Sequence, residues 1–223
     1  MNIFCLDDDP FRAAEGHLDK HVVKMIIEYA QLMSTAHRLL DGQETKFTLP
    51  DGKKQIINLL EGETAQLRIR LADGNYALND TDAIAKKTEK YQVTKPICYN
   101  ASHVNHPCGI WTRENRENYQ WLFDLFEACS IEYTRRYGKV HKTWIELGEF
   151  LSNAPKNIPE GKRTPFAVAM PEEFKVKDDP IASYKNYYLG PKTAFAKWTN
   201  RQPPTWFIAS TKDYDASNFE RTR

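Results

Sequence analysis

A cluster of residues able to exchange protons lies near the start of the chain, at His17-Leu18-Asp19-Lys20-His21 and in the segment that follows. Between Asp19 and Leu40 apolar residues recur every three or four positions, which predicts a long helix. Most of the remaining polar residues of this segment share one helical face, because they are spaced in the same way. They are Lys20, Lys24, Glu28, Gln31, Thr35 and Arg38.

This polar face is predicted to border a ligand. Carboxylate and ammonium groups on neighbouring helical turns shift each other's pKa values, as general acid/base chemistry near neutral pH requires. The candidate catalytic residues are Glu28, Lys24, Lys20, Gln31, His21 and His17. The same spacing is typical of ordinary ion pairs on a helix surface, so that alternative stays open.

A second candidate region begins at Asn105-His106-Pro107, which predicts the start of another helix. The exposed N–H groups of a helix start bind anions, and this segment adds histidine and arginine side chains to them. We expect phosphate contacts from His103, His106, Arg113 and Arg116. Cys108 beside the helix start could be a nucleophile, although a buried structural thiol is the favoured interpretation.

The third candidate region runs from Ile181 to Phe207 and contains no acidic residue. Basic side chains interleaved with aromatic ones suit a phosphate backbone with unstacked bases. The predicted nucleic-acid contacts here are Lys185, Lys192, Lys197, Arg201 and Trp206. An alternative is a helical pair that packs its aromatic side chains into the core and leaves its lysines in water.

No metal and no cofactor are predicted. His17 and His21 have the spacing of two metal ligands on one helix, but no glutamate follows His17 and the chain lacks a Cys-x-x-Cys pair. It also lacks a glycine-rich phosphate loop, a Gly-x-Ser-x-Gly elbow and a dinucleotide fingerprint, which argues against NTP-driven, α/β-hydrolase and Rossmann chemistry.

The elements that must position these residues are mostly helices. Besides the long helix, the patterns predict helices at 10–16, 107–137, 143–151, 180–190 and 191–198, with a loop at 157–180. Two runs flanking Pro50-Asp51-Gly52-Lys53 predict a β-hairpin, and further strands or a short helix follow near 63–78. The fold class is therefore mostly α, a compact helical single domain at 1–207 with a β-containing insertion at 43–95 and a polar tail at 208–223.

Composition limits the partners and the location. The 223 residues are 41% hydrophobic, which excludes disordered and fibrous classes, and 31 basic against 30 acidic residues give no overall hint of a partner. No apolar run is long enough to span a membrane. The absence of a basic leader and the four separated cysteines favour a cytoplasmic location.

Several short motifs resemble the phage pyrimidine-dimer DNA glycosylase/AP-lyase family of the endonuclease V type. They are His17-Leu18, Glu28-Tyr29, Ser102-His103-Val104 and Pro204-Thr205-Trp206-Phe207, in the order that this family shows. The chain also resembles phage-encoded proteins of unassigned role that begin Met-Asn-Ile-Phe and carry the segment Asp19–Met25. The resemblance covers about 120 scattered residues and implies a phage protein acting in an infected bacterial host.

The family resemblance implies base flipping, attack on the sugar C1′ by the N-terminal α-amine, and assistance from a helix glutamate, here Glu28. A lysine imine through Lys20 or Lys24 is an alternative, and Gln31 or Lys24 could occupy the place of the glutamate. The predicted partner is thus DNA or a nucleotide, with a flipped damaged or modified pyrimidine as substrate. The alternatives are a transferase that modifies a pyrimidine base in phage DNA and a non-catalytic nucleic-acid or nucleotide binder. The sequence does not indicate an oligomeric state.

Overall fold

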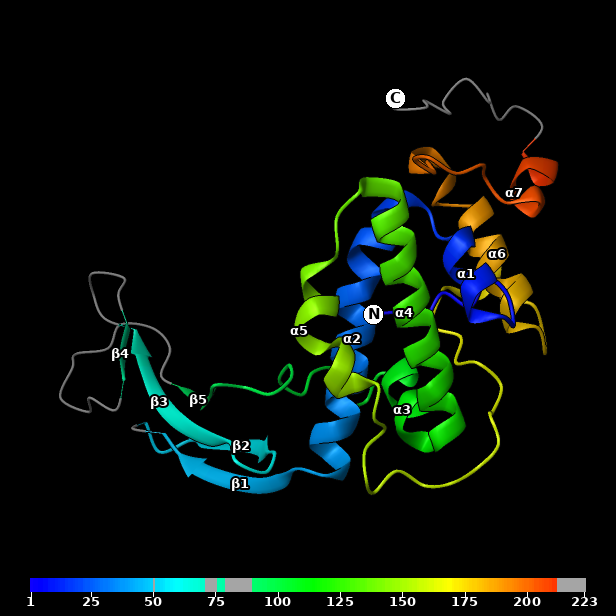
Figure 1. Cartoon of the computed structure of the whole chain (residues 1–223). Helices are drawn as coiled ribbons and strands as arrows, with labels where there is room; N and C mark the ends of the chain where they lie inside the picture. Colours follow the sequence, from blue (N-terminus) through cyan, green and yellow to red (C-terminus); the bar gives the residue numbers. More distant parts are fainter. Residues whose placement is uncertain (50, 71–75, 79–89, 212–223) are drawn as a thin grey trace.

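The computed structural model describes residues 1–49, 51–70, 76–78 and 90–211, with residues 69, 70 and 76–78 described by their backbone alone. Helices form the body of the molecule, and a small β-containing segment extends from it (Figure 1). The mostly α fold class is confirmed. The two longest helices, α2 (Asp19–Leu40) and α4 (Arg116–Tyr137), pack against each other and bury Tyr29, Tyr119 and Phe126.

The first two helices satisfy their first N–H groups in different ways. Asp9 caps α1 (Pro10–Gly16) by accepting hydrogen bonds from the backbone N–H groups of Phe11 and Arg12. Helix α2 starts at Asp19, whose N–H donates to the carbonyl of Lys197 over 2.8 Å. A backbone group from the far end of the chain therefore satisfies a donor that the helix leaves unpaired.

The single helix expected at 107–137 is wrong, because the structure has two helices there. Helix α3 (Pro107–Glu114) ends at Asn115, whose extended backbone (φ −157°) turns the chain before α4 begins. The Asn115 side chain then accepts from the N–H of Asn118 over 2.9 Å. Asn115 therefore caps a new helix. Short polar residues such as asparagine favour helix caps over helix interiors, and this preference ends α3.

The C-terminal third contains α5 (Lys142–Leu151), the loop with a 3-10 turn η1 (Glu172–Phe174), and α6 (Pro180–Leu189). The helix expected at 191–198 is wrong, since only the turn η2 (Thr193–Phe195) forms there. Backbone groups of Lys197 and Thr199 instead bond to Asp19. Helix α7 (Thr205–Ser210) crosses the boundary predicted at 207, and residues 212–223 of the predicted tail lie outside the described residues.

The insertion contains two antiparallel sheets. Strands β1 (Gln43–Thr48) and β2 (Lys54–Leu59) form the predicted hairpin, with Gln43 opposite Leu59. Strand β3 (Thr64–Arg70) lies between β4 (Tyr76–Leu78) and β5 (Lys90–Thr94), so the alternative of a helix near 63–70 is wrong. The sheets lie beyond the C-terminal end of α2, to one side of the helices (Figure 1).

A buried ion pair joins the insertion to α2. The Arg38 guanidinium donates to both carboxylate oxygens of Glu63, at 2.8 and 3.0 Å, and to three backbone carbonyls. Burial acts to raise the pKa of Glu63, but Arg38 and the N–H groups of Ile97 and Leu60 outweigh it and lower that pKa. Arg38 is therefore a structural residue, and the predicted polar face of α2 does not stay open along its whole length.

Candidate active site

The Glu28 carboxylate, on the polar face of α2, lies close to two amines. The α-amino nitrogen of Met1 lies 4.0 Å from Oε2 of Glu28, and the Lys24 Nζ lies 3.0 Å from its Oε1. The Glu28 side chain is 12% exposed and that of Met1 5%, whereas that of Lys24 is 71% exposed. Two amines of different accessibility thus share one carboxylate, which can accept a proton from either of them.

The first turn of α3 lies beside this group. Burial lowers the pKa of His106, and the positive charge of the Met1 amine and His103 lower it further, against an opposing effect of Glu28. The His106 ring also caps α3, because its Nδ1 accepts from the N–H of Cys108 over 3.2 Å. The structure therefore brings His106, predicted as a phosphate contact, next to the amine and to Glu28.

Cys108 follows His106 and is fully buried. Burial raises the pKa of its thiol, and this outweighs the backbone of Ile3 and the Met1 amine, which act in the opposite direction. The thiol form is thus favoured over the thiolate, which is the nucleophilic form. The structural interpretation of Cys108 is confirmed.

Two of the predicted catalytic histidines belong to the core. Both ring nitrogens of His17 are bonded at 2.7 Å, one to the carbonyl of Ala13 and the other to the Tyr29 hydroxyl. His21 stacks on Phe4 and bonds through Nδ1 to the Tyr188 hydroxyl over 2.5 Å. Their assignment as catalytic is corrected, because aromatic partners distant in sequence enclose both rings.

His17, His21 and a third buried histidine, His37 on α2, predict a loss of stability in acid. Burial lowers the pKa of His17 and His37 from 6.5 to about 4, and burial together with nearby positive charges lowers that of His21 to about 2. The unfolded chain binds these protons below about pH 6.5 and the folded chain does not, so stability is complete above that pH and falls as pH drops towards 4. Each histidine contributes roughly 1.4 kcal/mol per pH unit to this slope.

Urea unfolding measured between pH 7.5 and 4.5 tests this prediction. The free energy of unfolding should decrease throughout the range below pH 6.5, and His37→Asn should reduce the slope by about one proton. His103→Asn is the matched control, because His103 is exposed. A stability that stays flat from pH 6.5 to 4.5 contradicts the assigned burial.

The other α2 candidates lie at different depths. Lys20 is exposed, and its Nζ lies 4.5 Å from the centre of the Phe195 ring. Gln31 is partly buried and follows Glu28 by three residues, so it lies on the same helical face. Lys20 therefore lies between the polar face of α2 and the C-terminal segment. Gln31 lies beside Glu28, one turn further along α2.

The C-terminal basic residues divide into two groups. The ammonium of Lys185 lies over the Trp206 ring at 5.7 Å and that of Lys192 over the Tyr187 ring at 4.7 Å, while Lys197 is exposed. The nucleic-acid role of Arg201 is corrected, because its guanidinium donates to both oxygens of Glu132 and to Glu15. Tyr184, Tyr188, Trp198 and Phe207 are buried, so the alternative of aromatic core packing holds for these four.

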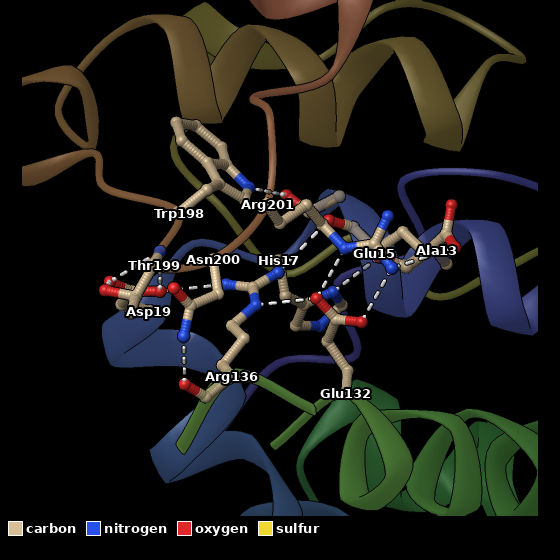
Figure 2. A network of polar contacts seen from close by, with 11 residues as sticks. Ala13, Glu15, His17, Asp19, Glu132, Arg136, Trp198, Thr199, Asn200 and Arg201 are labelled. Atoms are coloured by element: carbon tan, nitrogen blue, oxygen red, sulfur yellow. Dashed lines mark hydrogen bonds and ion pairs between the residues drawn. The ribbon is translucent and has the colours of Figure 1, made fainter. Parts of the chain in front are cut away.

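Arg201 belongs to a polar network that the sequence analysis missed (Figure 2). Arg136, with a fully buried side chain, donates to Glu132 over 2.6 Å and to Asp19 over 3.0 Å. Asp19 also accepts from the hydroxyl and the N–H of Thr199. Contacts among α2, α4 and residues 199–201 carry no local sequence signal, since they join residues up to 180 positions apart.

The two arginines predicted near α3 have different surroundings. Arg116 lies at the start of α4, and its Nε donates to Glu160 over 2.6 Å with both side chains largely in water. Arg113 is partly buried, and its Nη1 is enclosed without a hydrogen-bond partner. Of these two arginines, Arg113 is thus the one whose guanidinium has a nitrogen without a partner in the described part of the chain.

Comparison of the chain with known protein families, curated proteins and solved structures finds no match. Within the described residues, no group of three or more histidine, cysteine or acidic side chains could hold a metal ion. No described helix is long and apolar enough to cross a lipid bilayer.

Proposed function

We propose that the protein is a DNA base-processing enzyme in which the Met1 α-amine attacks the sugar C1′ of a flipped damaged or modified pyrimidine nucleotide. The contact between this amine and Glu28 carries the proposal. The resemblance to the pyrimidine-dimer glycosylases implies the same pair of groups, and the fold places them together although 27 positions separate them. Lys24, which shares the carboxylate, is far more exposed.

The chemistry needs a neutral amine and a group that handles protons. The amine nitrogen forms a bond to C1′ as the bond from C1′ to the base breaks, and the base leaves with the bonding electrons and takes up a proton. Opening of the sugar ring transfers a proton to O4′ and leaves a C1′=N iminium. Glu28 can accept the amine proton before attack and return a proton during ring opening.

The exposure of the two amines favours Met1 as the nucleophile. The Met1 side chain is 5% exposed and that of Lys24 is 71% exposed. Lys24, which is mostly in water, lacks the burial that makes lysine nucleophiles effective. We therefore assign Lys24 an electrostatic role beside the carboxylate.

Borohydride trapping on a duplex with an abasic site tests this function. The reagent reduces the iminium to a stable amine, which leaves DNA covalently joined to the protein. After nuclease trimming and trypsin digestion, the expected adduct lies on the peptide Met1–Arg12, which contains no lysine. Attachment at Lys20 or Lys24 would instead block cleavage there and appear on Ala13–Lys24 or His21–Arg38.

Two variants make this experiment decisive. Lys24→Arg should keep at least half of the trapped adduct, because it retains the charge and the α-amine. Two residues added before Met1 should abolish trapping, because they move the amine away from Glu28. Duplex binding without any adduct would refute the lyase and favour a non-catalytic binder, while transfer of a group to an intact base would favour the transferase.

A further inference from the structure

Several unpaired polar atoms belong to segments that border α3. Four buried side-chain atoms in the described part of the chain lack a hydrogen-bond partner, and three of them belong to Asn2, Ser102 and Arg113. Asn2 lies in the N-terminal segment beside Cys108, and Ser102 precedes the loop that leads into α3. An unpaired buried polar group costs roughly 1–3 kcal/mol, so such atoms in a native fold call for a ligand or another explanation.

The Arg113 guanidinium is the most informative of the three. Its Nη1 lies 3.6 Å from the point that a Cβ on Gly109 would occupy, and the His103 carbonyl and a Leu32 methyl lie 3.4 and 3.6 Å from the same point. Nη1 is therefore held over α3, where that helix meets α2 and the loop at His103. Gly109 leaves this space unfilled by a side chain of its own.

Among the described residues, no carboxylate forms an ion pair with Arg113, and its Nη1 has no hydrogen-bond partner. Burial lowers the pKa of Arg113. Arginine nevertheless remains protonated in proteins. Arg116, one helix later, forms an ion pair with Glu160 instead. A buried guanidinium nitrogen without an acceptor is suited to an anion supplied from outside.

The loop before α3 is fixed in the geometry that this arrangement needs. Thr35 on α2 holds Ser102 through two hydrogen bonds, from its hydroxyl to the Ser102 carbonyl and from the Ser102 N–H to the hydroxyl. His103 adopts a left-handed backbone (φ 51°), and its carbonyl accepts from the N–H of His106 over 2.8 Å. A non-glycine residue in this region is strained, and such strain often marks a binding site.

We propose that Arg113, together with the Ser102 hydroxyl, binds a phosphate group of the nucleotide whose sugar reaches the Met1 amine. This inference rests on the proposed function and names the group that orients its substrate. A planar guanidinium matches phosphate oxygens with two parallel hydrogen bonds. The N–H groups at the start of α3 add favourable potential for an anion beside it.

A binding experiment that does not depend on catalysis tests this site. The probe is a fluorescent duplex with a tetrahydrofuran abasic analogue, which cannot form an imine. Arg113→Met should weaken binding by 10-fold or more and reduce the slope of log K against log salt by about one phosphate contact. Arg113→Lys keeps the positive charge and the aliphatic part of the side chain but loses the planar guanidinium, so it should weaken binding several-fold. This second variant keeps the site testable if Arg113→Met does not fold.

The matched control is Arg135→Met, which removes an exposed arginine near the end of α4 and should change affinity less than two-fold. Equal affinities of wild type, Arg113→Lys and Arg113→Met would overturn the proposal. If deoxythymidine monophosphate binds only when Arg113 is present, and duplex binding does not depend on Arg113, the site belongs to a free nucleotide. If duplex binding depends on Arg113 but borohydride traps no adduct, the phosphate site is supported and the proposed lyase activity is refuted.

Discussion

Glu28→Gln should slow the formation of the trapped adduct by about 100-fold or more, since general acid/base groups contribute roughly 10²–10⁴-fold to such reactions. The amide keeps the size of the side chain but can neither accept the amine proton nor return it to O4′. Glu28 is the carboxylate that lies within 4.0 Å of both amines, so the variant removes the group that the proposed mechanism requires.

Single-turnover trapping between pH 5.5 and 9 measures this effect. The wild-type protein should react faster than the variant throughout this range. Glu146→Gln is the matched control, because Glu146 forms an exposed pair with Lys142 at the same four-residue spacing. A Glu28→Gln protein that reacts at the wild-type rate, or that loses duplex binding to the same extent, would contradict the assigned role.

Glu132→Gln should lower the free energy of unfolding by about 3 kcal/mol, because loss of one partner of a buried ion pair leaves the other charge uncompensated. Glu132 accepts hydrogen bonds from two arginines, Arg136 and Arg201, and both its side chain and that of Arg136 are almost fully buried. Burial acts to raise the pKa of Glu132, but the two guanidinium groups outweigh it and lower that pKa. The carboxylate is therefore charged in the folded protein.

Urea unfolding at pH 7.5 measures this change, with the exposed residue Glu146→Gln again as the control for a lost helix ion pair. That control should cost less than about 0.5 kcal/mol. The double variant Glu132→Leu with Arg136→Met should recover part of the loss, because it removes two buried charges together. A Glu132→Gln protein as stable as the wild type would show that the network in Figure 2 does not hold the C-terminal segment in place.

The candidate site was predictable in part. The types and spacing of Lys24 and Glu28 and the start of α3 at His106 were visible in the sequence, and the resemblance suggested the α-amine. What the sequence could not show is that the amine meets Glu28, or that the Arg113 Nη1 is enclosed while Arg116 forms an ion pair with Glu160. Helical spacing defines a shared face, and only the packing of other segments decides how deeply each residue of that face is buried.

The sequence by itself determined the helices α1, α2, α5 and α6 and the hairpin β1–β2, because caps, prolines, glycines and apolar periodicity act within a few residues. The tertiary structure alone decided that His17 and His21 enter the core and that Arg201 pairs with Glu132, 69 positions away. The physical reason is that hydrogen bonding and burial depend on which distant segments exclude water from a side chain. Local propensity carries no information about those segments.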